Sequence, residues 1–315
     1  MSKISAVIDK SLFHELCKLP DSKERERLWH ELHQKYQLIV PLMLIEETIV
    51  NAVAPGKKLF DEVERLVEQV ALHSSCWLED VYEIVFRELV EKALPTTLPP
   101  LAEPITAELF KLRRDDDLLK LWVEERKEGA RTTHNQWKGE QTQLTASALA
   151  RGVKLELKSE SELFDFVRSK FRHTLLDVEM RKEMLESILG VTFRSRHQNG
   201  ELIDKAFAEF TPKSLTNYYA TLAFLKCRLA YVLAPVFTLP GSSPTARLRF
   251  LKQKVNNVYD AEYVTSALIC DRFLTRDKEQ ARMCRIFELA GFWKGKVVYI
   301  PPGQDIRTAL PSALI

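Results

Sequence analysis

Apolar and polar positions follow two different patterns along the chain, one at its two ends and one in the middle. Near the N-terminus, short apolar runs at 4–8 and 37–41 are bounded by polar turns, which is typical of buried strands. Around them, apolar residues recur three and four positions apart and predict helices over 11–19, 22–36 and 42–53. This succession of strands and helices favours a parallel α/β sheet.

The same pattern returns near the C-terminus, after the turn-forming segment PGSSP. We expect a helix over 246–271, a short strand at 272–275, a helix over 278–291 and a final buried strand at 296–301. Both ends of the chain therefore predict elements of an α/β sheet.

The middle of the chain shows helical spacing almost throughout, with charges between the apolar positions. A proline-rich segment at 95–104 predicts an extended connection. The most apolar run, 215–237, has Lys226 and Arg228 at its centre, which favours a buried helix over a membrane span. No internal repeat interrupts this pattern.

These patterns predict one α/β domain with a Rossmann-type parallel sheet, divided by a large insertion. Residues 1–53 and 245–315 would form the two halves of the domain, and residues 54–244 would form an all-helical insertion. Chain ends commonly meet to complete one domain, and insertions are tolerated in exposed connections. A chain of 315 residues with 45% hydrophobic residues is long and apolar enough for such a core.

Cysteine usage and the N-terminal sequence both predict a cytoplasmic protein without a membrane partner. The five cysteines are odd in number and form no CxxC pair, which argues against a disulfide framework and against a structural zinc site. The opening residues, MSKISAVIDK, lack the charged and then apolar pattern of a signal peptide.

The net charge of +2 conceals an uneven distribution. Residues 241–315 contain twelve Lys and Arg against seven Asp and Glu. Within this segment Arg247, Arg249 and Lys252 follow one another with no acid between Pro244 and Asp260. Such a run favours contact with the phosphates of a nucleic acid, although a solvated helix face explains it equally well.

Lone acidic side chains stand where the predicted strands end. Asp9 directly follows the first strand, and Asp277 follows the strand at 272–275. Glu47 lies in the helix after the second strand, and Asp260 lies in the helix before the third. Ligands of parallel α/β sheets bind beyond the carboxyl ends of the strands, so all four could reach one rim. Converging carboxylates repel one another unless a cation neutralises them, and oxygen ligands suit Mg²⁺ or Mn²⁺.

In this order and setting, the acids resemble those of the PIN-like nuclease family. The matching motifs are AVID, VPLMLIEET, DAEYVTSA and LTRD, which contain Asp9, Glu47, Asp260 and Asp277. In the second motif, Glu46 stays open as an alternative to Glu47. The resemblance implies that these acids hold Mg²⁺ or Mn²⁺ as catalytic ligands and that the protein hydrolyses phosphodiester bonds.

The resemblance covers about 1–53 and 245–301, and it departs from small PIN domains in the long connection between the second and third acids. It implies a metal-dependent nuclease, with RNA a better candidate substrate than DNA. By analogy, the role would be that of a toxin or defence effector. The residues expected at the substrate are Thr275, Arg276, Arg247, Arg249 and Lys252. Thr275 could also support the last aspartate or touch the metal shell.

Simpler explanations compete at each acid. Asp9 could cap the helix that begins at Ser11, Asp260 could be an ordinary helix cap, and Asp277 could be a turn residue. Glu46 and Glu47 could both lie on a solvated helix surface. A different class of function also stays open, namely an inactive PIN-fold interaction protein whose insertion binds a partner or inhibitor protein. The insertion could equally extend the core and support an oligomer.

Overall fold

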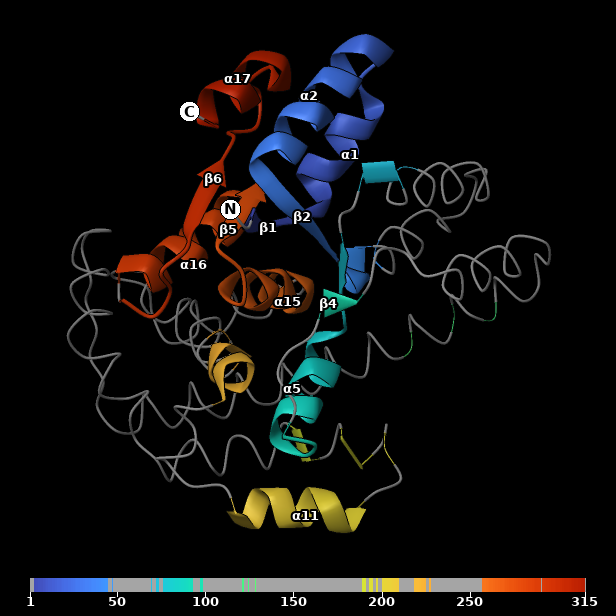
Figure 1. Cartoon of the computed structure of the whole chain (residues 1–315), viewed down its shortest axis with the longest axis vertical. Helices are drawn as coiled ribbons and strands as arrows, with labels where there is room; N and C mark the ends of the chain where they lie inside the picture. The colour runs from blue at the N-terminus through green and yellow to red at the C-terminus, as the bar shows by residue number, and fades with distance from the viewer. Residues whose placement is uncertain are drawn as a thin grey trace, which may run out of the picture.

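A computed structural model of the chain shows a sheet with helices on both faces (Figure 1). The structure describes residues 3–44, 47, 69, 72–73, 76–92, 97–98, 121, 124, 128, 189–190, 193–194, 197, 200–209, 218–224, 227, 257–289 and 291–314.

The sheet has the strand order β4-β3-β2-β1-β5-β6. Its strands are β1 (Ile4–Ile8), β2 (Tyr36–Pro41), β3 (Cys76–Leu78), β4 (Thr97–Leu98), β5 (Arg272–Thr275) and β6 (Lys296–Tyr299). All neighbouring strands are parallel except β4, which runs antiparallel to β3. The central strand β1 is apolar because helices cover both faces of the sheet, and Val7, which lies opposite Ile39 and Phe273, is fully buried.

Helices cover both faces of this sheet, and one of the two faces is shared by helices from both ends of the chain (Figure 1). The described helices are α1 (Lys10–Lys18), α2 (Ser22–Lys35), α5 (Val81–Leu89), α11 (Gly200–Glu209), α15 (Asn257–Leu268), α16 (Lys278–Leu289) and α17 (Ile306–Ala313). In Figure 1, α1, α2 and α17 lie on one side of the strands, and α15 and α16 lie on the other. Helix α15 contacts β1 on one side and α5 on the other, so α15 lies between the sheet and α5.

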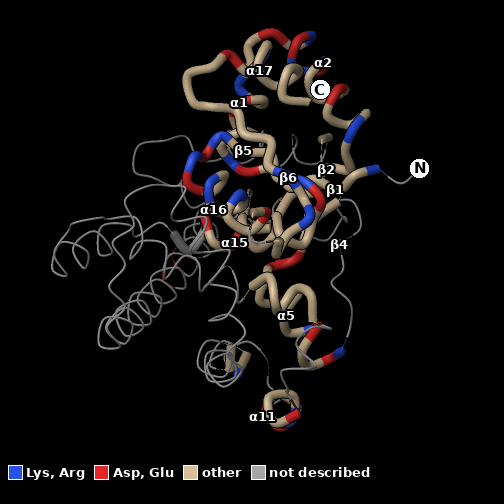
Figure 2. The backbone as a smooth tube through the Cα atoms, turned by 90° about the vertical axis from the view of Figure 1, so that its left-hand side faces the viewer, with Lys and Arg blue, Asp and Glu red and all other residues tan. Residues whose placement is uncertain are grey.

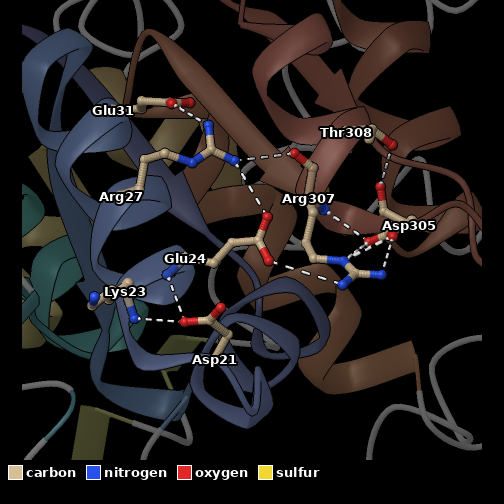
Figure 3. A network of polar contacts seen from close by, with 8 residues as sticks. All are labelled: Asp21, Lys23, Glu24, Arg27, Glu31, Asp305, Arg307 and Thr308. Atoms are coloured by element: carbon tan, nitrogen blue, oxygen red, sulfur yellow. Dashed lines mark hydrogen bonds and ion pairs between the residues drawn. The ribbon is translucent and has the colours of Figure 1, made fainter.

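A surface network of charged residues joins the last helix to the second (Figure 3). Arg307 pairs with Asp305 at 2.5 Å, and its guanidinium lies 3.9 Å from Glu24 of α2. Arg27 of α2 donates a hydrogen bond to the backbone carbonyl of Arg307 at 3.4 Å and pairs with Glu31. These side chains are between 27% and 51% exposed, so water screens the contacts, which add little to the free energy of unfolding.

The order in which the chain adds strands to the sheet reverses between the parallel strands β1 and β5. From β1 the chain passes through α1 and α2 to β2 on one side, whereas from β5 it passes through α16 to β6 on the other side. Such a switch point leaves a crevice outside the carboxyl ends of the two strands, because the connections leave in opposite directions. The fold therefore marks the ends of β1 and β5 as the place for a ligand.

The four strands predicted from the two chain ends are confirmed, and they form one parallel sheet as expected. The prediction that 54–244 is all-helical is wrong, because β3 and β4 lie inside that range and extend the sheet beyond β2. Strand β3 is only three residues long, CWL, and so short a run has no period that distinguishes it from a helix.

Some predicted elements fall partly outside the described residues. Of the helix expected over 42–53, residues 42–44 and 47 are helical, and of the helix expected over 246–271, residues 257–268 are helical. Helix α17 was not predicted, because Pro311 lies inside it and proline normally interrupts a helix.

Two further observations concern membranes and cysteines. In the ranges that the structure describes, no helix combines the length and the apolar character that crossing a membrane requires. All five cysteines have free thiols, and four of them are buried.

Candidate active site

The first predicted acid lies at the end of β1 and is almost fully buried. Asp9 is 1% exposed, and its backbone N–H donates to the carbonyl of Leu274 in β5 at 3.0 Å. Its Oδ1 accepts from the N–H of Leu12 at 2.7 Å, so it caps α1 as the simpler explanation proposed. Its Oδ2 accepts from the hydroxyls of Ser11 at 2.7 Å and Thr275 at 2.5 Å. Capping thus accounts for only one of the two oxygens.

A single threonine hydroxyl joins the first acid to the fourth. Thr275, the last residue of β5, is fully buried; its hydroxyl donates to Asp9 and accepts from the N–H of Asp277 at 2.8 Å. Asp277 in turn accepts from the N–H of Gln280 at 2.8 Å and so caps α16. The switch point therefore holds Asp9 and Asp277 on neighbouring strands through one side chain.

The third acid joins the cluster through contacts between two helices. Asp260 lies inside α15 rather than at its cap, and its Oδ1 accepts from Nε2 of Gln280 at 2.8 Å. Helices α15 and α16 pack on each other, which brings Gln280 to Asp260. Gln280 is 6% exposed, and its Oε1 is a buried acceptor with no hydrogen-bond partner within the described ranges.

The second acid is paired with a lysine. The carboxylate of Glu47 lies 2.8 Å from the ammonium of Lys10, and each side chain is 21% exposed. The hydroxyl of Tyr263 lies 3.5 Å from the other carboxylate oxygen of Glu47. Tyr263 is 1% exposed and lies three positions after Asp260 on α15.

The shifted pKa values of Asp9 and Asp260 reflect burial and electrostatic repulsion among the acids. Burial, the largest cause, raises the pKa of Asp9 to about 6, and the charge of Asp277 contributes to the rise. Burial also raises the pKa of Asp260 to about 6, with contributions from the charges of Asp277, Glu47 and Asp9. The pKa of Tyr263 lies well above its ordinary value because it is buried beside Glu47 and Asp9. All four acids are thus close enough for their charges to interact.

The chemistry of the cluster suits a hard divalent cation, although the ligands are not yet gathered around one point. Carboxylate and carboxamide oxygens are the ligands that Mg²⁺ and Mn²⁺ prefer, and the unpartnered Oε1 of Gln280 adds such an oxygen. Across the described part of the chain, no group of three or more His, Cys, Asp or Glu side chains is arranged so that it could hold a metal ion. The carboxylates are engaged by hydrogen bonds and by the Lys10–Glu47 pair, so a bound ion would have to rearrange these contacts.

The other predicted site residues fall into two groups. Thr275 is enclosed and supports Asp9 and Asp277, which is one of the two roles expected for it. Arg276 is 6% exposed; its guanidinium pairs with Glu15 and donates to the carbonyls of Pro301 and Gln304. Contact between Arg276 and a phosphate stays a prediction, and it would require these contacts to open. Four candidates lie outside the described residues: Glu46, Arg247, Arg249 and Lys252.

The described surface beside the cluster carries charges of both signs. Basic and acidic residues interleave on α16, which begins directly after Asp277 (Figure 2). Lys278, which directly follows Asp277, is exposed at the start of that helix. A hollow of about 450 Å³ lies elsewhere, between the end of β6 and α17, and none of the four acids lines it.

Sequence reasoning missed three residues that complete the cluster: Lys10, Tyr263 and Gln280. Tyr263 stands three positions after Asp260 in α15, a spacing that puts both side chains on one face, and Gln280 stands three positions after Asp277, which caps α16. That spacing was a usable signal. Lys10 directly follows Asp9, but only the folded chain shows that its ammonium reaches Glu47.

Comparisons of the chain with family models, with curated proteins and with solved structures found no match. The case for a function therefore depends on the residues and the geometry of the cluster.

Proposed function

We propose that this chain is a divalent-metal-dependent nuclease of the PIN-like type that hydrolyses RNA. One observation carries the proposal: Asp9 and Asp277 lie at the switch point of a parallel sheet, share the hydroxyl of Thr275, and interact electrostatically with Asp260 and Glu47. Asp9 is buried and the other three acids are partly enclosed, and such a cluster of carboxylates destabilises a fold unless it serves a ligand of opposite charge.

The three aspartates would hold the metal, with Glu47 completing the acid cluster. A divalent ion at such a site supplies a more acidic bound water and offsets the charge that develops on a phosphate. Ser11 and Thr275 orient the carboxylate of Asp9, and Gln280 orients that of Asp260. Thr275 and Gln280 are buried, so these two donors cannot exchange freely with water and fix the carboxylates that they support.

The same proposal covers the finer description of the fold. The parallel strands from the two chain ends support a PIN-like core that a long connection divides, and the two strands β3 and β4 would extend that core. The reduced cysteines fit a cytoplasmic protein, and RNA in the cytoplasm is the substrate that we propose.

The test is cleavage of end-labelled single-stranded RNA, and of DNA of the same sequence, by purified full-length protein with Mn²⁺, with Mg²⁺ or with EDTA. We expect metal-dependent cleavage of RNA, its loss in EDTA, and its loss in Asp260→Asn. Asp271→Asn is the matched control, because Asp271 is an exposed acid eleven positions later that lies before β5 instead of after it. Equal cleavage by wild type and Asp260→Asn would assign the activity to a contaminant and reject the proposal.

A second candidate is an interaction protein that keeps the fold without the chemistry. The pairing of Glu47 with Lys10 and the lack of a ready-made metal group in the described ranges favour it. It predicts no cleavage and no change in melting temperature on addition of Mn²⁺, whereas a nuclease that binds the ion is stabilised by it.

A further inference from the structure

A lysine lies within the acid cluster and neutralises one of its members. Lys10 is the first residue of α1, directly after Asp9, and its ammonium lies 2.8 Å from Oε1 of Glu47. Both side chains are mostly enclosed, at 21% exposure. An ion pair in such a place is held more firmly than a pair on an open surface, because water screens it less.

The cluster is therefore unequal on its two sides. On the Glu47 side, Lys10 binds one carboxylate oxygen and the hydroxyl of Tyr263 lies 3.5 Å from the other. On the Asp260 side, the partners of Asp9, Asp260 and Asp277 in the described structure are all neutral donors. Among the residues that the structure describes, positive charge is thus paired with the Glu47 side and not with the Asp260 side.

The Asp260 side also has a polar group that awaits a partner. Gln280 donates its amide nitrogen to Asp260, and its Oε1 is buried without a hydrogen bond to any described residue. Buried acceptors are nearly always satisfied, by protein, by water or by an ion. A cation, or a water that it binds, would satisfy this oxygen together with the three aspartates.

We propose that Lys10 takes the place of a second cation, so that the site binds one divalent ion, on the side of Asp9, Asp260 and Asp277, while Glu47 stays with Lys10. This inference rests on the proposed metal site. Four carboxylates with Lys10 carry a charge of −3, and one divalent ion reduces it to −1. A second ion would first have to displace the ammonium from Glu47.

The experiment counts bound Mn²⁺ on the full-length protein by the electron paramagnetic resonance signal of free Mn²⁺ at neutral pH. We expect one Mn²⁺ per chain for wild type and two for Lys10→Met, because the freed Glu47 can then bind an ion. Lys18→Met changes the other end of the same helix and should keep one ion per chain. Lys10→Arg keeps the charge and should also bind one.

A second variant measures whether Glu47 is a ligand of the single ion. The Kd of Glu47→Gln for Mn²⁺ should stay within about threefold of the wild-type Kd. Loss of a carboxylate that is a ligand would weaken Mn²⁺ binding by more than about tenfold. Two ions on wild type, or one ion on a folded Lys10→Met, would overturn the inference while keeping the metal site. Absence of Mn²⁺ binding by wild type would reject the metal site of the proposed function, and the inference with it. Lys10→Gln replaces Lys10→Met if circular dichroism shows that the latter does not fold.

Discussion

The two ends of the β1–β5 strand pair carry the same kind of contact in opposite surroundings. At the carboxyl end, Asp9 accepts from the hydroxyl of Thr275, and both residues are buried. At the amino end, Asp271 accepts from the hydroxyl of Ser5 at 2.7 Å and from its N–H at 3.0 Å, and the contact is exposed. Each is an aspartate on one strand end held by a hydroxyl on the other.

The difference between the two ends is what surrounds the carboxylate. Asp271 is surrounded by water, so its charge costs little and its contacts only fasten the strands. Asp9 is enclosed with three further acids nearby, and burial raises its pKa to about 6. The same kind of hydrogen bond therefore only connects β1 and β5 at Asp271, whereas at Asp9 it belongs to a cluster of repelling carboxylates.

The largest expected effect concerns catalysis. Asp277→Asn should lower metal-dependent RNA cleavage by about 100-fold or more, because the site loses a charge that would hold the ion. Asp271→Asn should change the rate by less than about twofold, since it alters the far end of the same strand. Initial rates on labelled RNA measure both. A silent Asp277→Asn beside an inactive Asp271→Asn would reverse the comparison.

The next effect concerns stability at the buried contact. Thr275→Val keeps the shape of the side chain but leaves Oδ2 of Asp9 with one donor fewer and the N–H of Asp277 without its acceptor. We expect the free energy of unfolding to fall by about 2 to 4 kcal/mol, because the Asp9 contact is buried and the Asp277 contact is partly buried. Urea unfolding at neutral pH measures it. A loss below about 1 kcal/mol would mean that water reaches the site freely.

The pH dependence of stability should separate the acid cluster from the rest of the chain. The pKa of Asp260 is raised to about 6 in the folded protein from 3.8, so the folded state binds a proton more tightly than the unfolded state. Its ionised form therefore destabilises the fold increasingly as pH rises from about 4 to about 6, and fully above that range.

In EDTA, the free energy of unfolding of Asp260→Asn should accordingly match that of wild type near pH 4. At pH 7 the free energy of unfolding of Asp260→Asn should exceed that of wild type by on the order of 2 to 3 kcal/mol. Urea unfolding at each pH provides the measurement, with Asp271→Asn as the control that should show no such trend. Saturating Mg²⁺ should remove the advantage of the variant, because wild type then gains binding energy. An advantage that is the same at every pH would contradict an ionisation effect.

The smallest effect is expected at the exposed end of the strands. Ser5→Ala removes the hydroxyl that donates to Asp271 but leaves the backbone N–H contact at 3.0 Å. The free energy of unfolding should fall by about 1 kcal/mol or less, since water can replace the lost donor. The same urea titration as for Thr275→Val applies. Equal losses in both variants would show that burial does not distinguish the two ends.

The sequence by itself determined the four strands of the two chain ends and most of the described helices beside them, and it named four acids as candidates. Short runs with apolar centres, such as RFLT and KVVY, coincide with β5 and β6, because the buried positions of a strand within a sheet are apolar. Asp9 and Asp277 were predicted at strand ends for the same local reason. Helical spacing located α1, α2 and α16 to within one or two residues.

Only the tertiary structure decided which strands are neighbours and which donors meet each acid. Strand β3 could not be recognised locally, since three residues show no period, and its pairing with β2 is a contact between distant segments. The ion pair of Lys10 with Glu47 and the hydrogen bond of Gln280 to Asp260 join residues 37 and 20 positions apart. No local pattern encodes such pairs, because they depend on how α1, α15 and α16 pack around the carboxyl ends of β1 and β5.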